Sequence, residues 1–169
     1  MTTYVAFLRA VNVGGTGKLP MADLRAMCES IGLTNVRTYI ASGNVVFQSR
    51  LSEASVKAKL ERCLEEYAGK PVGVLVRTGA ELAAVLEGNP FKAQAPNRTV
   101  AIFLDAPPPA DTLATLSGRQ EEEVALGARE IYVHYGDGMA HSKLKIPAAR
   151  TGTARNMNTV ATLVAWAAA

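Results

Sequence analysis

A strand, a glycine-rich loop and a helix follow one another over residues 4–24, and this unit constrains the fold more than any other stretch. Residues 4–11 form a mostly apolar run of strand length. Three glycines between residues 14 and 17 end that run, and Pro20 stands where a helix accepts proline, in its first turn. The other elements of the first half are predicted around this unit.

The first 78 residues predict the order strand, helix, strand, strand, helix, strand. Apolar residues recur at helical spacing twice, and short apolar runs bounded by turn residues separate the two helices. This order is typical of the ferredoxin-like fold, in which an antiparallel sheet of order 4-1-3-2 carries both helices on one face. The predicted helices are 20–31 and the stretch between Ser52 and Gly69, and the later strands are 36–40, 45–48 and 72–76.

The second half predicts a smaller α+β lobe, so the fold class is α+β with lobes 1–78 and 79–169. Thr78 and Glu81 have the spacing of a capping box, which opens a helix through Leu86. Further along we expect a strand at 99–104, a short helix with Leu113 and Leu116 inward, a hairpin of 123–126 with 130–135, an irregular basic stretch over 141–155, and a last helix from Asn156.

Charge is unevenly distributed along the chain, although the net charge is only +3. Residues 1–78 hold ten basic and six acidic side chains, residues 79–137 hold four and nine, and residues 138–169 hold four and none. Solvated surface charge explains this pattern, and so does an anionic ligand that is bound where the two basic parts meet.

Several long motifs, in this order, resemble the bacterial domain of unknown function 1697 family over nearly the whole chain. They are FLRAVNVGGTGKLPMADLRAM, NVRTYIASGNVVF, VLVRTGAELAAVL followed by NPF, REIYVHYGDGMAHSKL and TARNMNTV. The resemblance implies two α/β-plait lobes and no particular activity. The chain departs from the family at Ala10, where glycine is frequent, at Met157, where an aromatic is frequent, and at Ala161-Thr162, where a lysine is common.

The glycine-rich loop indicates an anion site of a general kind. A phosphate-loop motif fails because its first glycine is missing and Leu19 follows Lys18 where the motif has Ser or Thr. A dinucleotide fingerprint fails because Pro20 takes the place of its third glycine. Backbone N–H groups ahead of a helix, with Lys18 beside them, still suit an anion. A tight strand-to-helix connection is the alternative.

The predicted topology brings this loop close to a second polar segment. Strands 1 and 2 of this fold are parallel, so residues 12–18 and the turn Ser42-Gly43-Asn44 should lie at one edge of the sheet. Ordinary turn chemistry also explains that turn. The sheet face without helices carries Phe7 and Arg9, as in RNA-recognition modules, but the RNP1 pattern is absent. Packing of this face on the second lobe or on a partner is the alternative.

The basic segment from Lys143 to Arg155 contains no acidic side chain. We expect Lys143 and Arg155 to line a cleft with the glycine-rich edge of the first lobe, because clustered like charges need a counter-charge. Pairing with the acidic residues 121–123 is the alternative, and Asn156 is explained equally well as a helix cap.

The sequence thus predicts a cytoplasmic protein that binds a phosphate-bearing ligand, either a nucleotide or a nucleic acid. Two cysteines without metal-ligand spacing suit a reducing compartment, and no stretch has a transmembrane or signal-peptide pattern. His134 and His141 lack ligand spacing, so we expect no metal, and no motif predicts a cofactor. The candidate ligand-binding residues are Arg9, Asn12, Gly14, Gly15, Lys18, Ser42, Asn44, Lys143, Arg155 and Asn156.

Two other classes of function remain open at this stage. One is an enzyme whose site lies between the lobes and uses Lys18, Arg9 or Arg155 electrostatically. The other is an interaction module that works through the helix-free face of the first sheet. The sequence assembles no nucleophile, histidine and carboxylate set, and it leaves the oligomeric state open.

Overall fold

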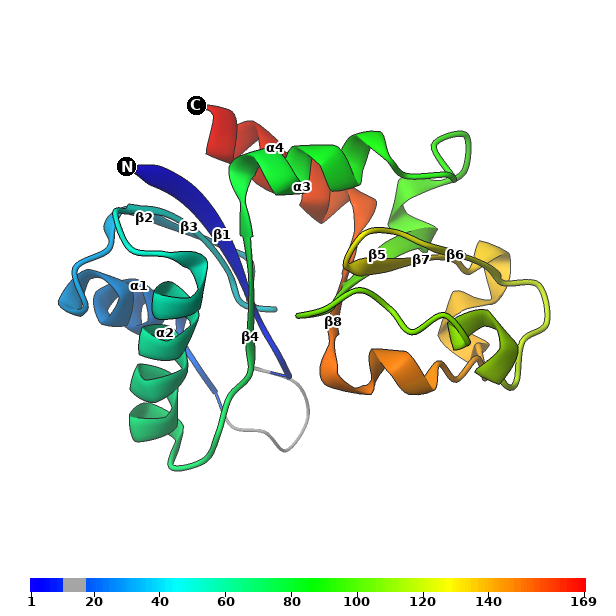
Figure 1. Ribbon diagram of the computed structural model, residues 1–169, viewed down its shortest axis with the longest axis horizontal. Coiled ribbons are helices and arrows are strands. Elements are labelled where there is room, and N and C mark those ends of the chain that lie inside the picture. Colours follow the sequence, from blue (N-terminus) through cyan, green and yellow to red (C-terminus); the bar gives the residue numbers. More distant parts are fainter. Residues whose placement is uncertain (11–17) are drawn as a thin grey trace. The chain divides into compact units, whose positions relative to one another are not determined.

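The computed structural model describes residues 1–10 and 18–169, so the predictions for Asn12, Gly14 and Gly15 lie outside the described residues (Figure 1). The chain forms two compact units, one of residues 1–82 with 163–169 and one of residues 83–162. Each unit is built on a four-stranded antiparallel sheet. No described helix is long and apolar enough to cross a membrane.

The sheet of the first unit has the predicted order. β1 (Thr2–Leu8) lies between β3 (Asn44–Ser49) and β4 (Val74–Thr78), and β2 (Thr34–Tyr39) pairs with the far side of β3. The order β2-β3-β1-β4 is the predicted 4-1-3-2 order written from the other edge. The ferredoxin-like arrangement is therefore confirmed.

Two helices cover one face of this sheet, as Figure 1 shows. α1 (Met21–Ser30) and α2 (Glu53–Ala68) turn their apolar stripes onto it. The α2 ends form as predicted, since Ser52 Oγ accepts a hydrogen bond from Ser55 N–H at 3.2 Å and Gly69 takes a positive φ of 72°. The buried cluster includes Ala6, Leu8, Leu24, Cys28, Val45, Phe47, Val56, Leu60, Leu64, Val74 and Val76.

The other face of the sheet is also covered. α4 (Met157–Ala168) ends in this unit, and the Trp166 ring meets the Tyr39 ring edge-on at 5.2 Å between centroids. The Arg37 guanidinium lies 3.9 Å from the centroid of the Trp166 ring. Phe7, which belongs to the same face, is fully buried. Of the two alternatives for this face, the structure therefore favours packing over an exposed surface, and the chain's own last helix contributes to its cover.

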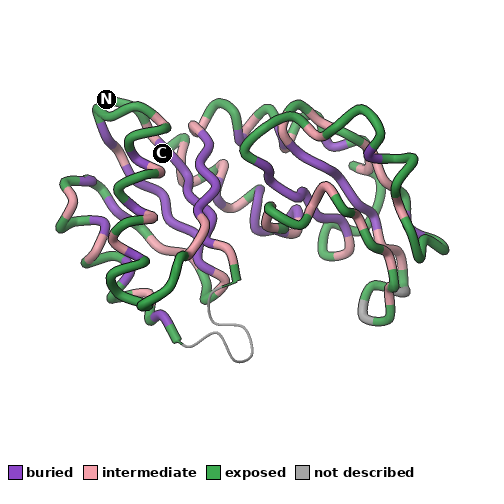
Figure 2. Tube along the Cα trace, turned by 60° about the horizontal axis from the view of Figure 1, so that its bottom comes forward, coloured by how far each residue is buried: buried purple, intermediate pink, exposed green. Residues whose placement is uncertain are grey.

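The second unit builds its sheet in the order β6-β7-β5-β8, and Figure 2 shows its central strands buried. β6 (Glu123–Leu126) and β7 (Glu130–His134) form the predicted hairpin. β5 (Thr99–Phe103) pairs with β7 on one side and with β8 (Thr153–Asn156) on the other. The irregular stretch predicted over 141–155 thus ends in a strand. Its polar sequence lacks an apolar alternation, and pairing with β5 supplies the order instead.

Short helices connect these strands. α3 (Gly79–Glu87) begins with the predicted capping box, since Thr78 N–H donates to Glu81 Oε1 at 2.9 Å and Glu81 N–H donates to Thr78 Oγ1 at 3.1 Å. The 3₁₀ helices are η1 (Pro96–Arg98), η2 (Thr112–Thr115), η3 (Gly136–His141) and η4 (Pro147–Thr151).

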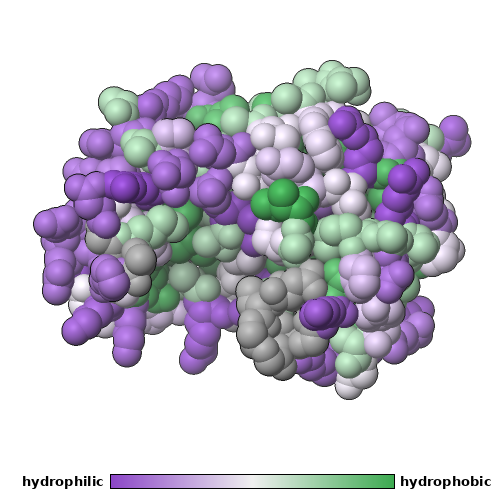
Figure 3. Space-filling model, turned by 180° about the vertical axis from the view of Figure 1, so that it is seen from behind, coloured by the Kyte–Doolittle hydropathy of each residue, from purple (hydrophilic) through white to green (hydrophobic). Residues whose placement is uncertain are grey.

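The inward placement of Leu113 is wrong. Its side chain is 49% exposed, while the neighbouring Thr112 is fully buried and donates through Oγ1 to the Pro109 carbonyl at 2.6 Å. The predicted helix is a single 3₁₀ turn, Thr112–Thr115, which ends before Leu116 and places Thr112 in the core instead. Exposed apolar side chains such as Leu113 and Ile40 are dispersed along the sequence, and hydrophilic side chains form much of the face in Figure 3.

Candidate functional site

The end of β1 lies at a polar edge of the first sheet. Leu8 N–H donates to the Gly43 carbonyl at 2.9 Å, and Arg9 N–H donates to the Gly73 carbonyl at 2.9 Å. The turn of residues 42–44 and the segment before β4 therefore flank the last residues of β1. We call the described residues around this strand end, Arg9, Ser42, Asn44 and Gly73, together with Lys18, which comes two residues before the N-cap of α1, the β1-end site.

Arg9 is held at this site by a close approach to the backbone. A Cβ atom on residue 73 would lie 2.9 Å from Arg9 Cδ, so the arginine stem keeps this position only beside a glycine and would have to shift for a larger residue. Arg9 is half-buried, which places a cationic side chain beside the end of the strand.

Lys18 stands next to the beginning of α1. Its side chain is exposed, whereas Leu19 is buried in the core cluster under the helices. Pro20 is the N-cap of α1 and has no side-chain acceptor, so the first N–H groups of the helix have no capping side chain. Asp23, in the first turn, accepts a hydrogen bond from the Tyr67 hydroxyl at 2.9 Å. The helix dipole and Lys18 both favour negative charge at this point.

The side chains of Ser42 and Asn44 stabilise the turn through hydrogen bonds. Asn44 is fully buried, and its side-chain amide donates to the Tyr39 carbonyl at 2.9 Å and to Ser42 Oγ at 3.0 Å. These contacts support the alternative of turn chemistry for the two residues. The positive charge of the β1-end site comes from Arg9 and Lys18.

The predicted residues of the second unit have different environments. Lys143 is exposed, while Arg155 is buried and donates through Nη1 to Thr153 Oγ1 at 2.8 Å and to the Ala154 carbonyl at 2.9 Å. Burial lowers the pKa of Arg155 to about 10. Asn156 Oδ1 accepts from Thr159 N–H at 2.9 Å, which makes it the cap of α4. Their cleft with the first unit stays a prediction.

The acidic run of residues 121–123 engages the beginning of the basic segment through Ser142. The Ser142 hydroxyl donates to Glu122 Oε2 at 2.5 Å, and Gln120 N–H donates to Glu122 Oε1 at 2.7 Å. The bond from Ser142, followed by the backbone bond, holds the pKa of Glu122 below its usual value. The partner of Glu122 is thus a hydroxyl just before the basic segment, and the predicted pairing of Lys143 or Arg155 with this acidic run is not among the described contacts.

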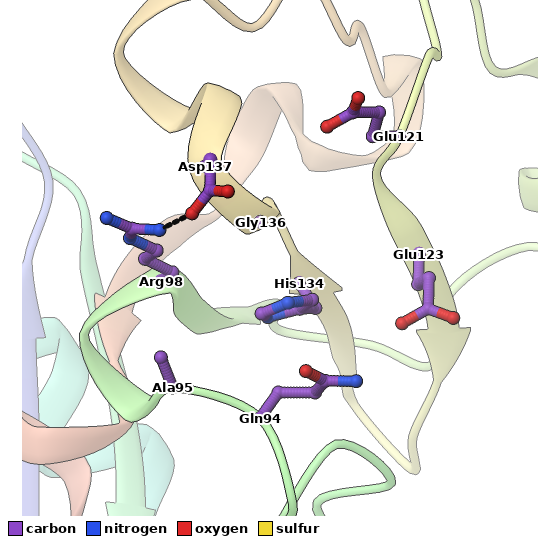
Figure 4. A pocket seen from close by; sticks show the side chains of 8 residues that line it. All are labelled: Gln94, Ala95, Arg98, Glu121, Glu123, His134, Gly136 and Asp137. Atoms are coloured by element: carbon purple, nitrogen blue, oxygen red, sulfur yellow. Dashed lines mark hydrogen bonds and ion pairs between the residues drawn. The ribbon is translucent and has the colours of Figure 1, made fainter.

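A pocket of about 380 Å³ lies within the second unit (Figure 4). Sequence reasoning did not predict it. It gathers residues from the segment before β5, from β6 and the turn before it, and from the end of β7 and the turn after it. Its lining consists of Gln94, Ala95, Arg98, Glu121, Glu123, His134, Gly136 and Asp137. We call it the His134 pocket.

His134 is the last residue of β7 and stands in a row across three strands. The strand register pairs it with Glu123 on β6 and with Thr99 on β5, so the three side chains share one face of the sheet. His134 is only 9% exposed, and its Nδ1 lies 3.0 Å from Thr99 Oγ1. The Phe91 ring packs against the imidazole at 6.1 Å between centroids.

The charges that line the His134 pocket are mostly negative. Arg98 forms an ion pair with Asp137, drawn as a dashed line in Figure 4. Glu121 and Glu123 are exposed and have no basic partner among the described residues. The hairpin pattern contained a signal for this pocket, since a turn around residues 127–129 sets Glu123 opposite His134.

Neither place gathers metal ligands. In the part of the chain that the structure describes, no group of three or more His, Cys, Asp or Glu side chains could hold a metal ion. Both cysteines are free, and burial raises the pKa of the Cys28 thiol to about 12. Cys28 therefore serves packing and has little thiolate character.

The fold and these sites define a class of α+β proteins in which a ferredoxin-like unit is joined to a second antiparallel unit on one chain. The chain belongs to the family described as "Protein of unknown function (DUF1697)", whose model matches residues 1–132. The resemblance drawn from the sequence motifs is thereby confirmed.

The whole chain is also similar to a solved structure. The conserved bacterial protein SP0830 from Streptococcus pneumoniae superimposes with a TM-score of 0.81 at 26% sequence identity, and the match covers 98% of each chain. None of the curated proteins matches the chain. The similarity supports the fold and brings no activity with it.

Proposed function

We propose that the protein binds a phosphate-bearing ligand, a nucleotide or a nucleic acid, at the β1-end site. Two observations support this proposal. Arg9 lies at the end of β1, where the turn of residues 42–44 and Gly73 flank the strand. Lys18 comes two residues before the N-cap of α1, and that helix N-terminus has no capping side chain. We further propose a cytoplasmic location, which the two free cysteines support.

Three features of the site favour an anion together. An exposed lysine supplies a mobile point charge, and an arginine supplies a fork of donors that suits phosphate oxygens. The beginning of α1 adds the positive end of the helix dipole. The acidic side chain of its first turn, Asp23, accepts a hydrogen bond from Tyr67 on α2. The positive charge of these groups favours a phosphate group over an uncharged ligand.

The test compares Lys18→Ala with Arg50→Ala. Arg50 is exposed and follows the last residue of β3, a strand that begins with Asn44. Arg50→Ala therefore removes the same charge at the opposite end of the strands. We expect Lys18→Ala to weaken binding about fivefold and to lower the salt dependence by about one counterion, because one exposed charge contact is lost. Arg50→Ala should leave both nearly unchanged.

Two probes identify the kind of ligand. A nucleoside triphosphate is titrated while the melting temperature is recorded, and a labelled single-stranded oligonucleotide is titrated by fluorescence anisotropy. A shift with the first indicates a nucleotide and binding of the second indicates a nucleic acid. Equal weakening by the two variants, or no binding of either probe by the unaltered protein, would contradict the proposal.

The other two classes differ in their support. The cover that Trp166 gives to the second face of the first sheet removes the basis for an interaction module acting through that face. The enzyme that uses Lys18, Arg9 or Arg155 stays a prediction.

A further inference from the structure

We propose that the His134 pocket is a second binding site, for a small organic cation that carries N–H donors, such as a primary ammonium or a guanidinium group. In this site His134 Nε2 accepts a hydrogen bond from the ligand, and Glu123 neutralises the ligand's charge. The proposal concerns the second unit alone and does not depend on the β1-end site.

The tautomer of His134 follows from its hydrogen bonds. Thr99 has one hydroxyl proton, and Thr99 Oγ1 donates it to the Ala95 carbonyl at 3.1 Å. The contact of 3.0 Å between Thr99 Oγ1 and His134 Nδ1 must then use an Nδ1 proton. A neutral imidazole with its proton on Nδ1 carries a lone pair on Nε2. The chain Ala95–Thr99–His134 therefore makes Nε2 an acceptor.

This acceptor is open to the pocket. Every fully buried side-chain nitrogen or oxygen among the described residues has a hydrogen-bond partner. The ring of His134 hydrogen-bonds only to Thr99 among those residues, so Nε2 is not fully buried. The remainder of the ring is shielded, and His134 lines the pocket. Figure 4 shows the imidazole between Arg98 on one side and Glu123 on the other. A buried ring thus presents one unsatisfied acceptor to the cavity.

The charges around His134 Nε2 favour a ligand that is positively charged and donates a hydrogen bond. Glu123 stands directly opposite His134 in the strand register, and Glu121 lies two residues before it. The one cation of the lining, Arg98, is paired with Asp137. Gln94 adds an amide that both donates and accepts. An anion would meet unpaired carboxylates here, whereas an ammonium or guanidinium group meets acceptors on several sides.

The size of the pocket fits a small molecule. A cavity of about 380 Å³ lies in the range of small-ligand sites and exceeds what a bare cation fills. Since no group of three or more metal-ligating side chains occurs among the described residues, the acceptors suit the directed N–H groups of an organic cation better than a metal ion.

The experiment uses the full chain labelled with ¹⁵N and a matched set of probes. 1,4-Diaminobutane and butylguanidinium carry the proposed groups, tetramethylammonium has the charge without N–H donors, and butanol has the chain without charge. We expect the unliganded protein to show the His134 tautomer with a proton on Nδ1. The first two probes should shift the Nε2 resonance in a saturable manner, and the last two should leave it unchanged.

Two variants and a control locate the binding. Glu123→Gln keeps the shape of the lining and removes its charge, and His134→Asn keeps a donor toward Thr99 while it removes Nε2. Each should weaken 1,4-diaminobutane binding about tenfold, since a hydrogen bond to a charged group is lost. Asp111→Asn, at an exposed position outside the pocket, should change the affinity less than about twofold, as expected for a distant surface charge.

The proposal is overturned by any of four results. The spectrum of the unaltered protein could show the proton on Nε2, or tetramethylammonium could shift the ring as strongly as the amines. Glu123→Gln could bind as well as the unaltered protein. A lysine-rich peptide could shift the Nε2 resonance while no small amine does, which would make the pocket a contact for a basic protein segment. The first result does not depend on whether the His134 variant folds.

Discussion

The β1-end site and the His134 pocket differ in charge and in how the chain builds them. Arg9 and Lys18 make the first site cationic, and they follow directly from the turn of a strand into a helix. Glu121 and Glu123 make the second site acidic, and Glu123 stands opposite His134 only because β6 and β7 pair in one register. The position of the first site follows from the order of the strands and helices. The second site depends on the strand register, and a slip of one residue would turn the side chain of Glu123 to the other face of the sheet.

The two units also differ in what surrounds one glycine in each of them. Gly73 leaves room for the side chain of Arg9, and Gly118 leaves room for the backbone of Lys143. A side chain with several rotatable bonds can move away from a new methyl group, whereas a backbone carbonyl held by neighbouring structure cannot. Equal substitutions at the two glycines should therefore have unequal effects.

The largest effect is expected for Gly118→Ala. Gly118 has a φ of +69°, and a Cβ atom there would overlap the carbonyl oxygen and carbon of Lys143. The backbone of Ser117 is paired with that of Lys145 close by, so neither segment can shift freely. We expect a loss of about 3 kcal/mol in the free energy of unfolding, measured by urea denaturation. A loss below about 0.5 kcal/mol would show that this junction of the second unit yields easily.

A smaller effect, dependent on pH, is expected for Ser142→Ala. The hydroxyl of Ser142 lowers the pKa of Glu122, so its contribution to stability is present above the pKa of the unfolded chain and is lost as the pH falls through the folded pKa. The variant should melt at a lower temperature than the unaltered protein at neutral pH. The difference should become smaller at an acid pH below the folded pKa, where the carboxyl is protonated in both states.

The control for this prediction is Ser30→Ala, because Ser30 Oγ donates to a backbone carbonyl and touches no carboxylate. Its change in melting temperature should be the same at both pH values. A pH-independent effect of Ser142→Ala would show that its bond to Glu122 does not distinguish the two protonation states.

The sequence predicts more of the fold in the first unit than in the second, because the helix and turn patterns of the first unit all agree with one topology. Two amphipathic helices, a cap at Ser52 and a glycine at residue 69 all indicated the same order of elements. The turn of residues 42–44 was placed correctly beside the end of β1 because topology alone requires it. What the sequence could not show is that Asn44 is buried and uses its amide within the turn.

In the second unit the fold and the pocket depend on contacts between short polar segments that are distant in the sequence. β8 has no apolar alternation, so only its pairing with β5 identifies it as a strand. In the sequence His134 lacks a neighbour at metal-ligand spacing, and its neighbours in the structure, Thr99 and Glu123, come from two other strands. Such neighbours are fixed by register across the sheet, and register is weakly encoded in short strands with polar residues.

The smallest effect on stability, and the sharpest distinction between the two glycines, is expected for Gly73→Ala. A Cβ atom at residue 73 would lie 2.9 Å from Arg9 Cδ, and Gly73 does not have a positive φ. The arginine can rotate away, so the free energy of unfolding should change by less than about 0.5 kcal/mol.

The guanidinium of Arg9 would then leave its place in the β1-end site, and nucleoside triphosphate binding should weaken about threefold, as for one displaced surface charge. Urea denaturation and a nucleotide titration on the same sample separate the two quantities. The control is Gly69→Ala, whose added Cβ has open space around it but whose φ of +72° strains a side chain. It should lose about 1 kcal/mol of stability and keep its affinity, which tests whether destabilising this loop is enough to weaken binding. If Gly73→Ala destabilises the protein as much as Gly118→Ala does, the contact of Gly73 with Arg9 is part of the fold and the contrast between the two glycines fails. If stability and affinity are both unchanged, Arg9 does not contribute to the β1-end site.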